Sequence, residues 1–291
     1  MDSCYAIAFY LGDRRRKFPS YEVDRLCYLK KQIETLTVNK HSLNKIYFIF
    51  SVEEDHYDLL NKAFNIIPKN IQGAGVEIIV RKNVGFSYGA WSDLMDKTNH
   101  DYYIFNEDDY FFIEDGWDSY MINSFKEKPN CGGFGIHVAF ALRWHSKWGD
   151  SVDKKGEHFG HSCFCTSREI IQDIKTNYDG FTYPKTLNYQ ENERNQVLFS
   201  HTLVEAGYRL YDIRDDYDLN FAETDPSSYE GGLKIRKIVN HEPEKHLIIP
   251  DVIAFNFPYE WWLPYDGCFR LEKRMREEFP HYNPEVKLTQ I

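Results

Sequence analysis

Three consecutive acidic residues, Glu107, Asp108 and Asp109, interrupt an otherwise apolar stretch of the chain, YYIFNEDDYFF at residues 102–112. The run before them has the length and aromatic content of a buried strand, and such a strand delivers the acids to a sheet edge, where open α/β sheets bind ligands. Crowded carboxylates repel one another and are costly to keep ionised away from water. Oxygen ligands of this kind suit Mg²⁺ or Mn²⁺. The sequence therefore predicts a divalent cation site, and the alternative is a solvated acidic turn.

A glycine-bearing segment, NVGFSYGA at residues 83–90, offers a second candidate binding motif. Its glycines let a ligand approach the backbone closely, and the free amides at a helix start attract a phosphate or sugar oxygen. No Gly-Lys-Ser/Thr follows, so the segment is not a P-loop. It comes after the third predicted strand and lacks a third glycine, which also excludes a dinucleotide-binding fingerprint.

The elements that position these motifs alternate between strand and helix. The predicted strands are Ile7–Leu11, Ile46–Phe50, Val76–Val80 and Tyr102–Phe105, and the helices between them are Ser20–Leu36, Glu53–Phe64 and Ser87–Met95. This alternation predicts a parallel sheet with helices on both faces. The loop after the first strand, the Asn83–Gly89 turn and the acids should then share one edge of the sheet.

The pattern after residue 115 is less regular. Helices are predicted at Trp117–Phe125, Ser167–Thr176, Asn192–Ala206 and Phe269–Glu278, strands at Cys131–Phe140, His161–Thr166 and Tyr208–Ile213, a loop at Trp144–Gly160, and turns over residues 214–247. Glycine just after a helical pattern is a good stop signal, as at Gly207.

Composition excludes several classes of function. The net charge of −10 disfavours nucleic-acid binding, which needs a positive field. No stretch approaches the roughly 20 apolar residues of a membrane helix, so we expect a protein without an integral membrane segment, cytoplasmic or peripheral at a membrane. The six cysteines are scattered without a CxxC pair, which predicts buried, reduced thiols.

Taken in order, the two motifs resemble those of the GT-A glycosyltransferases that use nucleotide-sugar donors, especially inverting family 2. Asn83-Val84-Gly85 with Gly89-Ala90 matches that family's N-x-G…A segment, and Glu107-Asp108-Asp109 matches its D-x-D-type motif with Glu at the first acid. The resemblance spans residues 5–213 in order of elements. It implies a GT-A-like (Rossmann-like), mostly parallel sheet flanked by helices, with a C-terminal extension. In that one continuous domain, residues 1–115 would bind the nucleotide-sugar donor and residues 116–291 the acceptor.

The resemblance also implies roles for individual residues. Asp109 would ligate Mn²⁺ or Mg²⁺, Glu107 would reach the metal or the donor ribose, and Asp108 would assist directly or through water; a second interpretation uses Asn106 with Asp108. Asn83 and Gly85 would contact a UDP-, GDP- or dTDP-sugar. Its base and ribose would meet the exits of the first two strands, residues 10–13 and 51–55, with Tyr10 and Asp13 as candidates, although Tyr10 could instead be a core residue. A late histidine, His241 or His246, would complete the metal site.

An inverting transferase also needs a carboxylate that takes the proton from the acceptor hydroxyl. The resembling family carries it before a helix that ends in Ala-Gly-Tyr, which residues 206–208 match. The expected acidic position falls on Asn195-Gln196, so the front of this region departs from the pattern. Glu193, followed by Glu191, is the nearest upstream candidate. The alternative is that both are exposed acids favoured by the helix dipole.

Aromatic and histidine residues in the irregular segment could form the acceptor site. Trp144, Trp148 and His161 are the candidates, because flat aromatic faces with polar handles suit sugar rings. The acceptor would be a glycan, lipid-linked or protein molecule. Packing of a lid is the competing interpretation.

Three other functions fit less well. A sugar-nucleotide pyrophosphorylase would show a Gly-rich basic loop after the first strand, whereas this chain has LGDRRRK. A glycosidase needs two carboxylates about 5–10 Å apart across a cleft, and adjacent acids suit a metal better. A catalytically inactive carbohydrate-binding or assembly module would fit the aromatic abundance and the altered acidic spacing.

Overall fold

The computed structural model of the protein describes residues 2–12, 24–53, 56–108, 110–112, 114–135, 138–141, 156–159, 163–178, 199–212, 235–238 and 246–249. These residues include the first five strands of the chain and both predicted binding motifs except Asp109.

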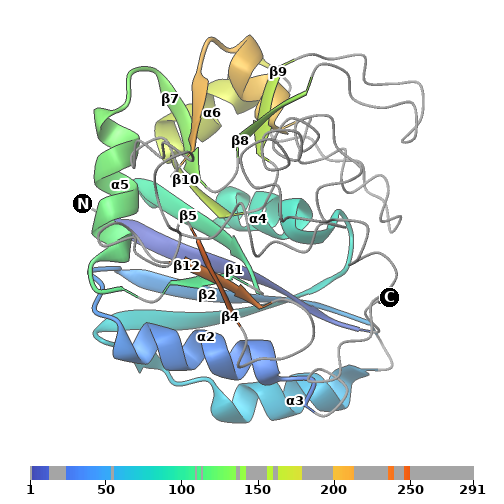
Figure 1. The fold of residues 1–291 in the computed structure, drawn as a ribbon. Helices are drawn as coiled ribbons and strands as arrows, with labels where there is room; N and C mark the ends of the chain where they lie inside the picture. The colour runs from blue at the N-terminus through green and yellow to red at the C-terminus, as the bar shows by residue number, and fades with distance from the viewer. Residues whose placement is uncertain are drawn as a thin grey trace, which may run out of the picture.

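An eight-stranded sheet forms the centre of the fold, in the order β11-β7-β10-β5-β1-β2-β4-β3 (Figure 1). The strands are β1 Ser3–Leu11, β2 Lys45–Val52, β3 Asn70–Ile71, β4 Ala74–Lys82, β5 Tyr102–Glu107, β7 Cys131–Gly135, β10 Cys163–Ser167 and β11 Arg209–Asp212. β5, β1, β2 and β4 run parallel, as do β7 and β11, whereas β10 is antiparallel to both of its neighbours. The predicted α/β class, a mostly parallel sheet flanked by helices, is confirmed.

Helices cover both faces of this sheet. Helices α2 Cys27–Val38 and α5 Trp117–Glu127 lie on the face to which Tyr5 points, since Tyr5 contacts Gln32 of α2 and Trp117 of α5. Helix α4 Phe86–Lys97 lies on the other face, where its Trp91 packs against Phe105 of β5 at 5.2 Å between ring centroids. The remaining described helices are α3 Tyr57–Ile66, α6 Arg168–Asn177 and a helical segment at 199–205.

The aromatic residues of the chain account for much of the core. β1 and β2 are buried along almost their whole length, as expected for central parallel strands covered on both faces. The largest fully buried side chains are Trp91, Trp117, Tyr5, Tyr88, Tyr103, Tyr110, Phe48, Phe50, Phe105 and Phe134. Among the described residues, many of the aromatic side chains thus fill the core and are not exposed to a ligand.

Two smaller sheets accompany the central one. β6 Tyr110–Phe112 pairs with β12 Ile235–Ile238, which pairs in turn with β13 His246–Ile249, and β8 Val138–Ala141 pairs with β9 Gly156–Phe159. β5 ends at Glu107 in the central sheet and β6 begins at Tyr110 in the three-stranded sheet. The chain therefore passes from one sheet to the other across Asp108 and Asp109.

Several predicted boundaries are wrong. α2 begins at Cys27, well after the predicted Ser20. Asp24 Oδ1 accepts a hydrogen bond from the Leu26 amide just before the helix, a local turn that competes with helix. The predicted Cys131–Phe140 strand is two strands, β7 and β8, in different sheets.

Strands also occur where loops or turns were predicted. β9 lies within the predicted 144–160 loop, and β12 and β13 lie within and just beyond the turn-rich 214–247 segment. These strands are too short to show a recognisable alternation of apolar and polar residues in the sequence. The predicted helix at 269–278 lies outside the described residues.

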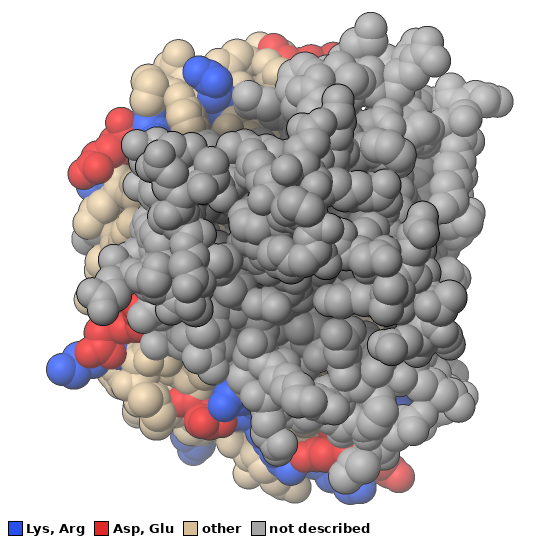
Figure 2. All heavy atoms as spheres, in the orientation of Figure 1, with Lys and Arg blue, Asp and Glu red and all other residues tan. Residues whose placement is uncertain are grey.

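The described surface and helices can be compared with the expectations for nucleic-acid binding and membrane insertion. On the face shown in Figure 2, the described Lys and Arg residues lie scattered among Asp and Glu along the margins of the view. No helix in the described part of the chain is long and apolar enough to cross a membrane.

The described cysteines are free thiols. Burial raises the pKa of Cys4 and Cys165 well above the usual value and that of Cys131 to about 12. These three thiols therefore stay protonated.

Candidate functional site

The carboxyl ends of four parallel strands meet at one edge of the central sheet. Leu11 pairs with Val52, and Val52 pairs with Lys82, so β1, β2 and β4 end level with one another. β5 ends three residues short of that line, because its last residue, Glu107, pairs with Ala8. The segments that follow these strands, including Asn83 and the acidic motif, therefore share this edge, as the alternating pattern predicted.

A direct hydrogen bond joins the two predicted motifs. Ser87 Oγ, in the first turn of α4, donates to Glu107 Oε1 at the end of β5 over 2.7 Å. The charge on the acceptor makes such a bond stronger than one between neutral groups. The acid motif and the Asn83–Gly89 turn are thus parts of one site.

The turn itself is shaped for close approach by a ligand. Gly85 occupies the N-cap position of α4 with φ of 72°, a left-handed conformation that glycine adopts without strain. Asn83 is nearly buried, and its Oδ1 has no hydrogen-bond partner among the described residues. Buried polar atoms are normally paired, so this oxygen is suited to accept a hydrogen bond from a ligand hydroxyl or amide.

The Arg81 side chain stabilises the turn through hydrogen bonds. Its guanidinium donates to Asp93 Oδ2 at 2.8 Å, to the Val84 carbonyl at 2.6 Å and to Ser51 Oγ at 3.1 Å. The side chain is only 9% exposed, so these bonds are shielded from water. β2, the turn and α4 are consequently held in fixed relation by one cation.

Asp108 is buried next to Glu107, whereas the neighbouring Asn106 faces the core. Asp108 is 7% exposed and Asn106 is fully buried. Asn106 Nδ2 donates to the Tyr5 hydroxyl at 2.6 Å and to the Tyr110 carbonyl at 2.7 Å. Both N–H groups of the Asn106 amide are therefore used inside the core. The residues of this motif that lie at the sheet edge are the acids that follow Asn106.

Tyr10 lies at the exit of β1 and is partly exposed, so the core position considered for it does not apply. Its hydroxyl donates to Glu53 Oε1, just after β2. The ring lies over Gly12 so closely that a Cβ there would meet its atoms at 2.3 Å. The hydrogen-bonded Tyr10 and Glu53 side chains thus lie at the same edge of the sheet as the acidic motif.

The three-stranded sheet directs a later segment toward the acids. Ile235 pairs with Phe112 and Lys237 with Tyr110, so β12 runs antiparallel to β6 and back toward the acidic motif. β13 then returns, with His246 paired to Ile238. The end of β12 therefore lies beside Tyr110 at the start of β6, and β12 separates β13 from β6.

The remaining predicted site residues lie outside the described part of the chain. These are Asp13, Asp109, Trp144, Trp148, His161, Glu191, Glu193 and His241. Within the described residues, no three His, Cys, Asp or Glu side chains are grouped to hold a metal ion. Glu107 and Asp108 are the described members of the predicted cation site, and their carboxylate oxygens have the donor chemistry that Mg²⁺ and Mn²⁺ prefer.

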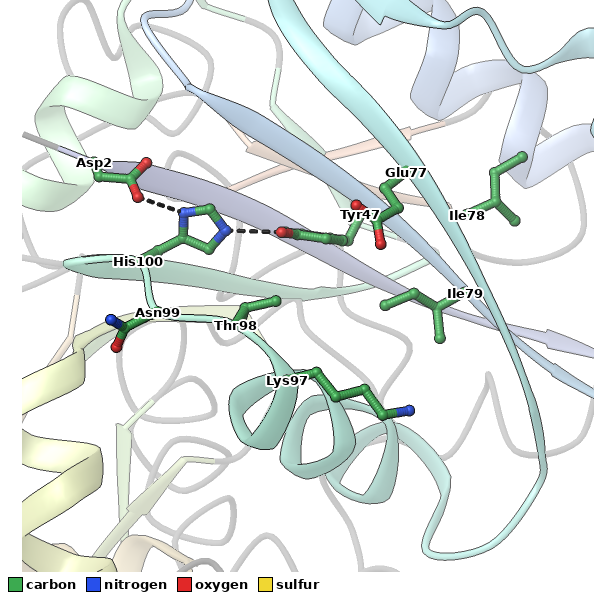
Figure 3. A pocket seen from close by; sticks show the side chains of 9 residues that line it. All are labelled: Asp2, Tyr47, Glu77, Ile78, Ile79, Lys97, Thr98, Asn99 and His100. Atoms are coloured by element: carbon green, nitrogen blue, oxygen red, sulfur yellow. Dashed lines mark hydrogen bonds and ion pairs between the residues drawn. The ribbon is translucent and has the colours of Figure 1, made fainter.

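A hollow of about 540 Å³ lies at the opposite, amino-terminal end of the strands (Figure 3). There His100 Nδ1 pairs with Asp2 Oδ2 at 2.9 Å, and the Tyr47 hydroxyl lies 2.8 Å from His100 Nε2. Both ring nitrogens are engaged, so the histidine ties the start of β1 to β2 and to the segment before β5. None of the acidic-motif or Asn83-turn residues lines this hollow.

Sequence reasoning missed three residues of the site. The sequence pattern assigns no role to Ser87 within the turn motif, and it includes Glu53 only as one position of the donor-facing range 51–55. Arg81 does have a usable signal, because it is a cation at the end of a strand that precedes a glycine turn. Their roles depend on which strands are neighbours, which only the sheet order reveals.

No protein-family model and no curated protein sequence matches the chain. Solved structures with a similar fold include CMP:2-keto-3-deoxy-manno-octonic acid synthetase complexed with CTP, with 11% identity, 73% of this chain and 89% of that chain covered, and a TM-score of 0.40. The 4-diphosphocytidyl-2C-methyl-D-erythritol synthase from Anaerococcus prevotii has 8% identity, coverage of 73% and 86%, and a TM-score of 0.44.

A mannosyltransferase from Pyrobaculum calidifontis in complex with GDP-Man and Mn²⁺ has 7% identity, coverage of 72% and 54%, and a TM-score of 0.43. These likenesses are too distant to assign an activity. The function proposed below is supported by the residues of this chain.

Proposed function

We propose that the protein is a metal-dependent glycosyltransferase that moves a sugar from a UDP-, GDP- or dTDP-sugar to a glycan, lipid-linked or protein acceptor. The supporting observation is the Ser87–Glu107 hydrogen bond, which joins an acidic motif to a glycine turn at a helix start. A cation site next to the N-terminus of a helix suits a diphosphate, because the cation and the helix N-terminus both favour negative charge.

Residues 1–115 would bind the donor. The α4 amides after Gly85 would face the diphosphate, and Asn83 Oδ1 would accept a hydrogen bond from a ribose or sugar hydroxyl. Tyr10 offers a ring on which a base can stack, and Glu53 offers an acceptor for a base N–H. Asp13 would lie at the same exit of β1.

The acidic motif would hold Mn²⁺ or Mg²⁺. Asp109 and Glu107 are the proposed ligands, with Asp108 assisting and His241 reaching the ion from the β12–β13 connection. When bound, the cation would neutralise the charge that develops on the leaving nucleoside diphosphate. Glu107 would approach from a position fixed by Ser87.

The acceptor would bind over residues 116–291, with Trp144, Trp148 and His161 as its contacts. Glu193, or Glu191, would take the proton from the acceptor hydroxyl as its oxygen forms the new bond to the anomeric carbon. The bond between that carbon and the diphosphate oxygen breaks with its electrons on the leaving group. Attack opposite the leaving group inverts the anomeric configuration.

Thermal unfolding with ligand mixtures tests this proposal. We expect Mn²⁺ together with one of UDP, GDP or dTDP to raise the melting temperature, since a ligand at a hundred times its Kd adds about 2.7 kcal/mol of stability. EDTA should abolish the effect, and Asp109→Ala should not show it. Stabilisation by free glycans without nucleotide would instead favour a carbohydrate-binding module, and EDTA-resistant glycan hydrolysis would favour a glycosidase.

A further inference from the structure

A buried amide side chain from α2 contacts the backbone of the acidic motif. Gln32 is 1% exposed, and its Nε2 donates to the Asp108 carbonyl at 3.1 Å and to the Tyr110 carbonyl. A glutamine amide has only two N–H groups. Both are therefore used on the carbonyls of the two residues that flank Asp109 in the chain.

Two more buried residues complete this contact. Asn106 Nδ2 also donates to the Tyr110 carbonyl, at 2.7 Å, and to the Tyr5 hydroxyl, at 2.6 Å. The Tyr5 hydroxyl donates to Gln32 Oε1 at 3.4 Å. The side-chain donors of Gln32, Asn106 and Tyr5 are thus all engaged, and the network converges on two carbonyls of the acidic turn.

The network contains no charged group. Burial raises the pKa of Tyr5 well above its usual value, so its phenol stays neutral, and the two amides do not titrate. None of the three side chains therefore changes its protonation state over the pH range in which carboxylates bind cations. Asn106 Oδ1 has no hydrogen-bond partner among the described residues, so the two amides hold the turn through the bonds that they donate.

We propose that Gln32 is a positioning residue for the cation site. By holding the Asp108 carbonyl it fixes the peptide group between Asp108 and Asp109, and by holding the Tyr110 carbonyl it fixes the start of β6, without touching the ion. Carboxylate ligands bind well only when their own supports hold them in place. This inference rests on the proposed function, because it assumes that the acids bind a cation.

Substitution of Gln32 by methionine tests the inference, because it keeps the side-chain length and removes both donors. Mn²⁺ affinity can be measured by the EPR signal of the free ion, in the presence of UDP, GDP or dTDP. We expect about tenfold weaker binding or more. Tyr5→Phe removes only the link between the two amides and should weaken binding less.

Thr166→Val is the matched control. It removes another buried hydrogen bond to a backbone carbonyl, from Thr166 Oγ1 to Gly132 at 2.8 Å, in the same central sheet. We expect this variant to bind Mn²⁺ within about twofold of the unchanged protein, a difference well below 1 kcal/mol. Equal weakening in Gln32→Met and Thr166→Val would reduce the effect to general destabilisation and overturn the inference.

Amide hydrogen exchange without metal separates the inference from the proposed function. Gln32→Met should speed exchange at the amides of residues 108–112, and Thr166→Val should not. Unchanged exchange in Gln32→Met overturns the positioning role whatever the metal data show. Absence of Mn²⁺ binding by the unchanged protein would overturn the cation site and with it the inference. Normal Mn²⁺ affinity in a folded Gln32→Met variant would overturn the inference alone.

Discussion

Ser87 and Glu107 are joined by a hydrogen bond of 2.7 Å although they lie in different elements, one at the start of α4 and the other at the end of β5. The bond crosses from β5 to a helix that packs mainly on β1. Because β1 lies between β5 and β2 in the sheet, the two motifs come together only when the central strands are correctly ordered. The formation of the candidate site thus depends on the order of the strands in the central sheet.

Removal of the Ser87 hydroxyl should loosen Glu107. Ser87→Ala is expected to cost about 0.5–1.5 kcal/mol of stability, the usual net worth of one hydrogen bond, and to weaken Mn²⁺ binding severalfold. Ser87→Thr keeps the hydroxyl and should retain most of the affinity. Calorimetric titration with Mn²⁺ and nucleotide provides the measurement, and equal affinities for the two variants would contradict a role for the hydroxyl.

Asn83→Ala should separate binding from stability. The unpaired Asn83 Oδ1 is an unfavourable buried group in the free protein, so its loss should change the free energy of unfolding by less than about 1 kcal/mol while weakening nucleotide binding. Asn39→Ala is the control, because Asn39 Nδ2 donates to the Thr35 and Phe112 carbonyls. That variant should lose stability and keep nucleotide affinity. The reverse pattern in urea unfolding and nucleotide titration would argue against a donor contact at Asn83.

Asp109→Ala should abolish transfer with the fold intact. Loss of a main cation ligand removes electrostatic stabilisation of the leaving group, and rates should fall about a hundredfold or more. The melting temperature should hold or rise, since one of three mutually repelling carboxylates is gone. Asp58→Ala, in the first turn of α3, is the control and should keep normal rates. Full turnover by Asp109→Ala in a donor-hydrolysis or transfer assay would remove the motif from the mechanism.

His241→Gln should weaken Mn²⁺ binding about tenfold or more, because it removes a proposed ligand of the cation site. β12 ends beside Tyr110, next to the acidic motif, and His241 follows its last residue by three positions in the sequence. His246→Gln is the matched comparison from the same hairpin. An effect confined to His246→Gln would transfer the ligand role to that histidine.

Acid should destabilise the fold through His41. Burial lowers the pKa of His41 below its usual value, against the opposing effect of the Asp118 carboxylate. Below about pH 6.5 the unfolded chain takes up a proton that the folded protein resists. Stability contributed by the neutral ring is therefore complete above that pH and falls as the pH drops, by at most about 1.4 kcal/mol per pH unit. His41→Leu should flatten this dependence in urea unfolding between pH 7.5 and 5.5; an unchanged slope would assign it to other groups.

The sequence was sufficient to predict the alternation of elements from β1 to β5. Periodic apolar positions and the glycine turn marked strands and helices that the structure confirms, and parallel strands necessarily bring their carboxyl ends together. For this reason the sequence alone assigns Asn83 and Glu107 to one edge, and the Ser87–Glu107 hydrogen bond confirms that their motifs meet there.

Other features had no local signal. The reversal of β10 depends on how its backbone pairs with β5 and β7, and short strands such as β12 are too brief to show a period. Gln32 has a residue type that is mostly exposed in proteins, and only its bonds to Asp108 and Tyr110 distinguish it. These properties arise from tertiary pairing between segments far apart in the chain.

The passage of the chain between two sheets has a mechanical consequence. Asp108 and Asp109 are the whole link between β5, fixed in the central sheet, and β6, fixed beside β12. Gln32 of α2 and Asn39 just after it hold the carbonyls of Tyr110 and Phe112. A displacement of β6 would therefore strain its bonds to this helix as well as the link that carries the carboxylates.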